Sequence, residues 1–494
     1  MDAFTKIMKV LFIIRDTLIS EYLGAMSIAS MLKKHGHSVD LLRTRNDSLP
    51  KVTGEILSRK PDILAYSIMT GEHNYYISLN REIKKSVNAF SIFGGAHPTF
   101  FPEMINAEGV DAVCIGEGEY PMLDLANSMG KSVPVNEINN LWVKQAGTVY
   151  KNEIRAAVEN LDELPFPDRD FIYRGDPLLM RSKIKLFLSG RGCVFRCTYC
   201  FNEQYNGIYK GKGTIVRRKS VGYFIEEILR ARRDYPLEFV WINDDTFTLA
   251  TKDWLENFLS VYKSKINLPF NCNMRANFVD RETVRMLKEA GCHSVCMGVE
   301  CGNEEISQNI LKRNLTNEQI LKAMRILKEN RINVATLNLN ALPVRDPLRV
   351  DFETYKLNIV ERPSLAISSL LFPYPKTPIA EYAVKNNFCE GDYDNVPISN
   401  KTVTAFKFSK KEKRELQNFQ KLFGVAVEFP FLFPLVRALI KLPLHRVYYY
   451  IFYGWYGYCF KWRIMPTRIS FKDICVFFYQ AINYIGNLKP AKKK

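Results

Sequence analysis

Along the first ~130 residues, short apolar runs alternate with segments whose apolar residues recur at helical spacing. Val10–Ile14 is apolar at every position, which is typical of a strand covered on both faces. Leu23–Lys34 repeats apolar residues at helical spacing, and further strands are predicted at Val39–Leu42, Ile63–Ile68 and Phe90–Phe93. This alternation predicts an α/β domain over residues 1–130, built as a doubly wound parallel sheet that binds ligands at the carboxyl ends of its strands.

A second alternating series follows a connector, which we place at residues 131–180 because its acidic, proline-containing Leu161–Arg169 cannot lie inside a helix. Strands are predicted at Ile184–Ser189, Phe239–Ile242, Phe270–Met274, Ser294–Val299, Ile332–Leu342 and Leu365–Phe372, with helices at Val221–Arg233, Arg281–Ala290 and Asn317–Glu329. Asp280 is a predicted N-cap, and Thr316 with Gln319 forms a predicted capping box. About six strands predict a partial (β/α) barrel over residues 181–385.

The remaining residues, 386–494, read as a mostly α-helical region that is basic and aromatic. Residues 430–494 carry 11 of the 69 Lys and Arg, one acid (Asp473) and 17 of the 62 aromatic residues. Most of the net charge of +17 therefore belongs to this tail. Such a segment can bind a membrane surface, pack on the barrel or stack on nucleic acid, and its apolar character disfavours nucleic acid.

Composition excludes several classes of protein. With 47% apolar and 24% charged residues, the chain is neither disordered nor a polytopic membrane protein. The uncharged stretch Val447–Phe460 is too short to span a bilayer, and the apolar run before Arg15 is too short for a signal peptide. We expect a cytoplasmic protein whose tail, residues 430–494, can contact a membrane from one side.

The strongest chemical signal is a cysteine cluster after the first strand of the second series. Cys193, Cys197 and Cys200 have the spacing Cys-x3-Cys-x2-Cys. Three thiolates at this spacing suit three irons of a [4Fe-4S] cluster and leave the fourth iron open. A structural zinc is the alternative, but it needs a fourth ligand and the next cysteine is Cys272. The three cysteines are therefore predicted cluster ligands.

This cysteine motif, Ser189-Gly-Arg-Gly-Cys-Val-Phe-Arg-Cys-Thr-Tyr-Cys-Phe-Asn202, resembles that of the radical S-adenosylmethionine (SAM) superfamily. The resemblance implies that the open iron chelates SAM and that one electron cleaves it to a 5′-deoxyadenosyl radical. It also implies SAM-binding roles for strand-end residues of the second series, which are Asp244, Asp245, Arg275, Glu300 and, one helix later, Arg313. Structural roles are the alternatives: a turn for the aspartates, a salt bridge for Glu300 and a solvated charge for Arg313. The chain departs from the family at Ala341-Leu-Pro343, where Gly-x-Pro is usual.

The N-terminal half resembles the cobalamin-binding domain that precedes the barrel in one radical SAM subfamily. The carriers include Lys60–Ile63, Phe93–Thr99 and Ile115–Glu119. The resemblance implies cobalamin contacts from Ser67, Thr70, Gly94, Gly95 and His97, with His97 expected to shape its loop rather than to bind cobalt. Residues 16–21 read Asp-Thr-Leu-Ile-Ser-Glu, so no histidine ligand to cobalt is expected from that loop.

Together these resemblances imply an enzyme that uses a [4Fe-4S] cluster, SAM and cobalamin, and that methylates an unactivated carbon of a lipid or other small-molecule intermediate. A flavodoxin, ferredoxin or reductase is the expected electron donor. Three alternatives stay open: radical cyclisation, oxidation or rearrangement without methyl transfer; RNA modification, such as methylthiolation; and a non-catalytic cobalamin or redox sensor. The sequence names no catalytic side chain beyond these cofactor contacts.

Overall fold

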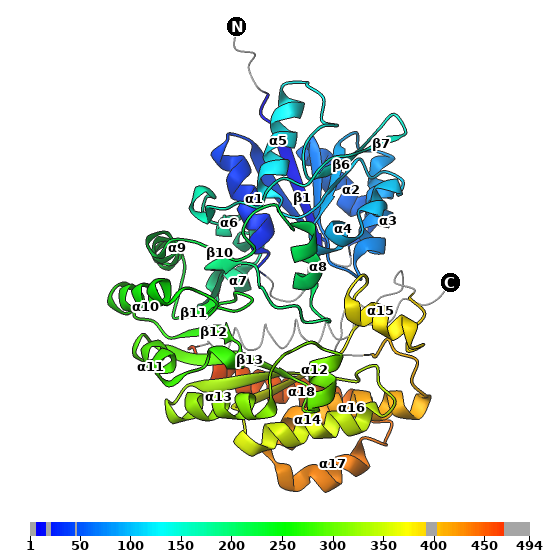
Figure 1. Cartoon of the computed structure of the whole chain (residues 1–494). Coiled ribbons are helices and arrows are strands. Elements are labelled where there is room, and N and C mark those ends of the chain that lie inside the picture. The colour runs from blue at the N-terminus through cyan, green and yellow to red at the C-terminus, as the bar shows by residue number, and fades with distance from the viewer. Residues whose placement is uncertain (1–5, 16–20, 45–46, 392–402, 469–494) are drawn as a thin grey trace. The chain divides into compact units, whose positions relative to one another are not determined.

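The computed structural model describes residues 6–15, 21–44, 47–391 and 403–468. Its described residues form two compact units (Figure 1). The first contains the described residues up to Arg181 and also residues 207–214, whereas the second contains residues 182–206 and the described residues of 215–468. The chain therefore leaves the second unit after the cysteine motif and returns eight residues later.

The first unit is built on a seven-stranded sheet of order β2-β1-β3-β4-β5-β6-β7, in which β1 to β5 are parallel. Its strands are β1 Lys9–Arg15, β2 Ser38–Thr44, β3 Ile63–Ser67, β4 Phe90–Gly94, β5 Ala112–Cys114, β6 Leu141–Gln145 and β7 Thr148–Lys151. Its helices are α1 Leu23–Lys34, α2 Leu49–Arg59, α3 His73–Lys84, α4 Ala96–Phe100, η1 Pro102–Asn106, α5 Glu119–Gly130, η2 Leu161–Glu163, α6 Arg169–Tyr173 and α7 Pro177–Arg181. The parallel part confirms the doubly wound α/β fold.

Residues 131–180 are more than a connector. They contain the hairpin β6–β7, which pairs antiparallel to β5 and extends the sheet at that edge. The hairpin turns at Ala146-Gly147, where both residues have positive φ. The sequence pattern missed these strands because a hairpin of this length has no helical repeat and its edge strand β7 is mostly exposed.

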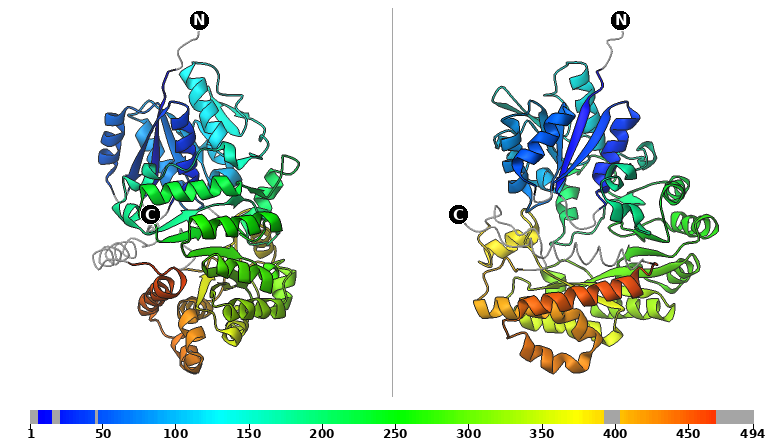
Figure 2. Two further views of the ribbon diagram at one scale, coloured as in Figure 1. Left: turned by 90° about the vertical axis from the view of Figure 1, so that its left-hand side faces the viewer. Right: turned by 180° about the vertical axis from the view of Figure 1, so that it is seen from behind.

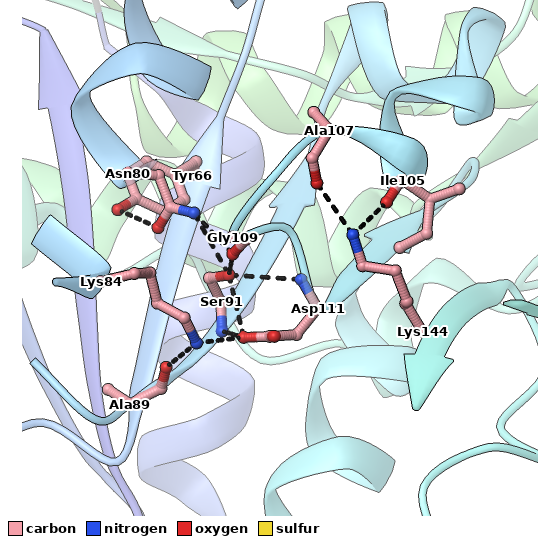
Figure 3. Close-up of polar contacts among 10 residues, drawn as sticks. All are labelled: Tyr66, Asn80, Lys84, Ala89, Ser91, Ile105, Ala107, Gly109, Asp111 and Lys144. Carbon is pink, nitrogen blue, oxygen red and sulfur yellow. Dashed lines mark hydrogen bonds and ion pairs between the residues drawn. The ribbon is translucent and has the colours of Figure 1, made fainter. Parts of the chain in front are cut away.

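A polar network ties α3 to the amino ends of β4 and β5 (Figure 3). The Asp111 carboxylate lies 2.6 Å from the Lys84 ammonium and accepts hydrogen bonds from the Ser91 N–H at 2.7 Å and hydroxyl at 3.0 Å. Asn80 joins the network through the Gly109 carbonyl at 2.7 Å. Because parallel sheets bind ligands at the opposite edge, this network has a structural role.

We expect the substitution Asp111→Ala to lower the free energy of unfolding by about 1–3 kcal/mol, because three donors of the network lose their acceptor. Urea unfolding followed by circular dichroism checks this value. Glu82→Ala is the matched control, since its partners on the exposed surface of α3 are solvated and its loss should leave the free energy of unfolding nearly unchanged. An equal loss in both variants would contradict the structural role of Asp111.

The second unit is built on six parallel strands in the order β15-β14-β13-β12-β11-β8, which confirms the predicted partial barrel. Its strands are β8 Ile184–Phe187, β11 Phe239–Ile242, β12 Phe270–Met274, β13 Cys292–Glu300, β14 Asn333–Asn340 and β15 Leu365–Leu370, with a small ladder of β9 Gly190–Arg191 and β10 Arg217–Arg218. Its helices are α9 Val221–Asp234, α10 Lys252–Lys265, η3 Ala276–Phe278, α11 Arg281–Glu289, α12 Glu304–Asn309, α13 Asn317–Glu329, α14 Pro347–Glu361, α15 Pro378–Lys385, α16 Lys410–Glu428, η4 Pro430–Leu432, α17 Phe433–Leu439, α18 His445–Cys459 and η5 Phe460–Ile464. Helix α8, Phe201–Ile208, follows the cysteine motif.

Alternate residues of the barrel strands face two different environments. On β13, Val295, Met297 and Val299 pack outward against the helices, in the same apolar cluster as residues of α9, α10, α11 and α13. The intervening positions, such as Cys296 and Gly298, therefore face the barrel interior. The predicted cap and capping box are both present, since Asp280 accepts from Thr283 N–H and Thr316 and Gln319 bond reciprocally.

The described part of the tail closes the amino-terminal end of the barrel. Cys459, Ile464 and Met465 are fully buried in one cluster with Phe239, Ala335 and Leu365 of three strands. The backbone of η5 is fixed as well, because the Ile464 carbonyl accepts from the Ser294 hydroxyl at 2.6 Å. Cys459, Ile464 and Met465 are thus part of the barrel core. Residues 469–494 of the tail lie outside the described part.

A ladder of stacked rings runs along the inner face of α18. Phe452, Tyr456 and Phe460 stack at centroid separations of 6.1 and 5.5 Å, and Phe460 meets the Trp241 ring edge-on at 6.2 Å. The tail therefore forms an aromatic floor beneath the barrel interior. Across the described residues, no helix is long and apolar enough to span a membrane.

Candidate functional site

The loop that carries the three cysteines leaves β8 and β9 and is pinned at both flanks. Thr198 lies between the last two cysteines, and its N–H donates to the Leu311 carbonyl at 3.1 Å while its own carbonyl accepts from the Ile379 N–H at 3.1 Å. Asn206 donates to the Cys193 carbonyl at 2.8 Å. Gly192 has φ +93°, and a Cβ there would lie 2.0 Å from the Ile215 carbonyl oxygen, so only glycine fits. These contacts fix the loop's shape.

The thiols of this loop are shielded from solvent but do not converge on one point. Cys193 and Cys197 are buried, and burial raises the pKa of the Cys200 thiol to about 12. Such thiols ionise only beside strong positive charge, which bound iron supplies. Among the described residues, no group of three or more His, Cys, Asp or Glu side chains is placed to hold a single ion. Cysteines of a [4Fe-4S] cluster each bind a different iron and so stand apart.

Two buried arginines stand beside the loop. The Arg313 guanidinium lies 3.9 Å from the Cys197 sulfur and donates to the Tyr199 hydroxyl at 3.2 Å. Arg275 donates to the Arg313 carbonyl, and its guanidinium carbon lies 3.8 Å from the centroid of the Phe195 ring. Burial, and secondarily the charge of Arg313, lowers the pKa of Arg275. Arg313 is therefore no solvated helix charge.

Both guanidinium groups keep a hydrogen-bond donor that no described residue accepts from. The buried Nε atoms of Arg275 and Arg313 have no hydrogen-bond partner among the described residues. A cluster held by three thiolates carries net negative charge, and SAM adds a carboxylate, for which Arg is well suited. The residues present therefore fit a [4Fe-4S] cluster with SAM bound beside Cys197.

Glu300 ends β13 close to Arg313. It is buried with φ +66°, burial raises its pKa, and the Arg313 charge opposes that shift. Gly298 lies between them, because a Cβ there would lie 2.5 Å from a Glu300 carboxylate oxygen and 3.0 Å from an Arg313 nitrogen. The Arg313 side chain also donates to the Gly298 carbonyl at 2.5 Å. The end of β13 at Gly298 and Glu300 thus forms, with Arg313, a cradle that a side chain at position 298 would fill.

The two aspartates after β11 have different environments. Asp244 is buried and pairs with Arg218 at 3.0 Å, and it accepts a hydrogen bond from the Ser189 N–H at 2.7 Å. This carboxylate holds the start of the cysteine loop, a role closer to the structural alternative. Asp245 is the more accessible of the two, although partial burial of its carboxyl raises its pKa, and a hydrogen bond from the Asn202 side chain opposes that shift. The sequence analysis did not identify Arg218, because its partner Asp244 lies 26 residues further along the chain.

Ala341 occupies the position where the family commonly has glycine. Its φ is +57°, which favours glycine, and its N–H donates to the buried Asp351 carboxylate at 3.1 Å. Burial raises the pKa of Asp351 well above its ordinary value. The turn is therefore retained in this chain, with Asp351 holding its backbone. The sequence pattern did not single out Asp351, which lies on α14 ten residues after Ala341.

In the first unit, the expected cobalamin residues gather at the carboxyl ends of β3 and β4. Ser67 lies beside Gly94 in the strand register. Gly95 is exposed with φ +99°, and a Cβ there would lie 2.9 Å from both the N and the O of Ile68. Glycine therefore lets the backbone cross closely and leaves a flat surface free of side chains, which fits a large planar ring.

His97 is buried rather than presented to a ligand. Its ring stacks on His73 at 4.1 Å and on Phe101 at 4.8 Å, and its Nδ1 lies 3.3 Å from the Thr70 hydroxyl. This arrangement agrees with a loop-shaping role and places Thr70 beside it. The loop for which no cobalt ligand is expected, residues 16–20, lies outside the described residues, and the adjoining Glu21 forms a buried ion pair with Arg169 at 2.6 Å.

A residue that the sequence did not single out completes this edge. Tyr209 lies in the segment 207–214, and its hydroxyl accepts a hydrogen bond from the Glu117 N–H at 2.9 Å. Gly116 makes the approach possible, since a Cβ there would lie 2.2 Å from the hydroxyl. The same segment bonds through the Lys212 carbonyl to the Ala157 N–H at 2.9 Å. The short return of the chain is thus integral to the first unit.

Two known families match the chain, one in each half. The B12 binding domain matches residues 14–126, and the Radical SAM superfamily matches residues 187–347. The curated relatives include an uncharacterized methyltransferase of Pyrococcus horikoshii, 27% identical over 378 residues that cover 74% of this chain and 79% of the relative. The hopanoid C-3 methylase of Methylococcus capsulatus is 24% identical over 379 residues, covering 72% and 67%.

Among solved structures, the radical SAM methyltransferase TsrM from Kitasatospora setae, with cobalamin and a [4Fe-4S] cluster bound, is similar in fold. Its TM-score is 0.61 at 16% identity, and the match covers 77% of this chain and 78% of that one. The two matched domains imply a [4Fe-4S] cluster with SAM, and cobalamin, as the cofactors. The chain thus carries a B12 binding domain followed by a domain of the Radical SAM superfamily.

Proposed function

We propose that the protein is a C-methyltransferase that acts on an unactivated carbon of a small molecule. The observation that supports this most directly is the guanidinium-lined cysteine loop in the same chain as a B12-binding domain with a glycine-surfaced ligand edge. When bound, the three cofactors supply radical hydrogen abstraction and a transferable methyl group. Similar proteins carry methyltransferase names, as in the archaeal and hopanoid examples above.

In this proposal each residue near the loop has a defined task. Cys193, Cys197 and Cys200 hold the cluster, and Arg313 binds the SAM carboxylate while Glu300 balances its charge. Asp245 faces the methionyl amine, because it is the exposed member of the aspartate pair. In the first unit, Ser67, Thr70, Gly94 and Gly95 contact cobalamin, and His97 supports Thr70.

The substrate side is also proposed. We place a small molecule in the barrel interior, where Leu337 of strand β14 stays 36% exposed whereas Ala335, on the same face, is fully buried in a cluster with tail residues. The exposed Leu337 side chain and the aromatic floor favour an apolar substrate, with a lipid as the preferred class. A flavodoxin, ferredoxin or reductase would deliver the electron. We place the protein in the cytoplasm, with a lipid substrate reached at the membrane surface.

The decisive test uses SAM with a deuterated methyl group. The reconstituted enzyme, a reductant and a lipid extract of cells that lack the protein should yield a product that carries the intact labelled methyl group. Mass spectrometry detects it, and the enzyme without reductant is the control.

Other outcomes separate the alternatives. SAM cleavage without label in the product would favour cyclisation, oxidation or rearrangement and contradict methylation. Label that enters RNA, and is lost after ribonuclease treatment, would favour RNA modification. A protein that holds its cluster but never cleaves SAM would be a sensor.

A further inference from the structure

One face of α18 is apolar and is not covered by the part of the chain that the structure describes. Its exposed side chains recur at helical spacing and continue beyond η5, in contrast to the buried side chains of the opposite face. We call this set the α18 stripe; it consists of Val447, Tyr450, Ile451, Tyr458 and Trp462, with exposed fractions of 50, 58, 39, 49 and 63%. The right panel of Figure 2 shows α18 running along the near side of the second unit.

The helix cannot turn this stripe inward. Its opposite face is already packed, because Tyr448 lies in an apolar cluster with residues of α16, Phe452 is buried and Cys459 is fully buried in the cluster of the barrel strands. Tyr448 is further fixed by donating to the Leu439 carbonyl at 2.8 Å. The exposure of the stripe is therefore a stable property of the folded unit.

Positively charged residues precede and follow the stripe along the chain. Residues 429–468 contain six Lys and Arg and no Asp or Glu. Lys441 and Arg446, just before and at the start of α18, are exposed and form no ion pair within the described part of the chain. Arg463 differs, since it pairs with Glu428 at 2.8 Å. An apolar, aromatic stripe bordered by unpaired cations is complementary to the headgroup and upper acyl region of an anionic bilayer.

We propose that the α18 stripe docks the enzyme on anionic phospholipid membranes, lying in the plane of the interface with Lys441 and Arg446 on the headgroups. The aromatic rings at both ends of the stripe, Tyr450 and Trp462, enter the interfacial zone that such side chains prefer. As a route to a lipid substrate this rests on the proposed function. Docking itself needs no turnover, so the two can fail separately.

The experiment is flotation of the full-length, cluster-reconstituted protein with vesicles of phosphatidylcholine alone or with phosphatidylglycerol added. We expect binding to the phosphatidylglycerol vesicles, weakened by salt. The double variant Ile451→Glu/Trp462→Glu should bind at least about tenfold more weakly, because two inserted apolar side chains become charged. Val360→Glu is the matched control, as Val360 is an exposed apolar residue, 59% accessible, on α14 of the same unit.

A second variant separates charge from apolar contact. Lys441→Glu/Arg446→Glu should lose binding to anionic vesicles by about tenfold. SAM cleavage, measured as 5′-deoxyadenosine formed with a chemical reductant, should be unchanged in all variants, which shows that they fold. The proposal is overturned if wild-type protein ignores anionic vesicles, if the control loses as much as the stripe variant, or if the stripe instead mediates a dimer that the variant abolishes.

Discussion

Replacing Cys193, Cys197 and Cys200 together with alanine should reduce both bound iron and SAM cleavage to background. The three thiols are the only protein ligands proposed for the cluster, and without it no electron can reach SAM. Iron and sulfide analysis, the brown colour and 5′-deoxyadenosine formation measure the effect.

Cys389→Ala is the matched control for this experiment. Cys389 is also buried but packs in an apolar cluster with residues such as Phe406. The control should keep its iron and its activity. A triple variant that stays brown and cleaves SAM would refute the central assignment.

Arg313→Met should weaken SAM binding to the cluster-loaded enzyme by about two to three orders of magnitude, because a buried charge pair with the SAM carboxylate is lost. The fold should lose roughly 3–5 kcal/mol of stability as well, since Glu300 keeps a buried carboxylate that no longer has an opposing charge. Isothermal titration with SAM and thermal unfolding measure the two effects separately.

Two further variants help to explain the effects of Arg313→Met. The double variant Arg313→Met/Glu300→Gln should recover much of the stability while SAM binding stays weak, which distinguishes carboxylate recognition from folding. Arg325→Met is the matched control on the same stretch of chain, because Arg325 pairs with Glu361 on the exposed face of α13. Normal SAM affinity in Arg313→Met would contradict the assignment.

The sequence predicts the local features of the fold well. Helix α13 begins and ends where the capping box at Thr316 and the loss of apolar repeat place its ends, and β12 matches its predicted bounds. These elements are specified by neighbours within a few residues. The hairpin β6–β7 and the packing of η5 on β13 depend on partners far along the chain, so no local pattern reveals them.

The same distinction holds for the site. Motif spacing brings the cysteine loop, Glu300 and Arg313 together as expected, because the carboxyl ends of parallel strands meet at one edge. It cannot separate Asp244 from Asp245, whose opposite environments arise from Arg218 on a different strand pair. Likewise, a tail rich in aromatics does not reveal which rings enter the core and which remain outside.

Residues 207–214, which return to the first unit, determine how the protein can be cut into fragments. A fragment ending at residue 181 would contain every strand of the B12-binding unit yet lack the Tyr209 hydroxyl above Gly116 and the Lys212 carbonyl on Ala157. Any cut that isolates that unit as one continuous piece leaves the N–H groups of Glu117 and Ala157 without these hydrogen-bond acceptors. Limited proteolysis should therefore nick the chain without releasing a clean domain, and cobalamin binding is best studied in the intact polypeptide.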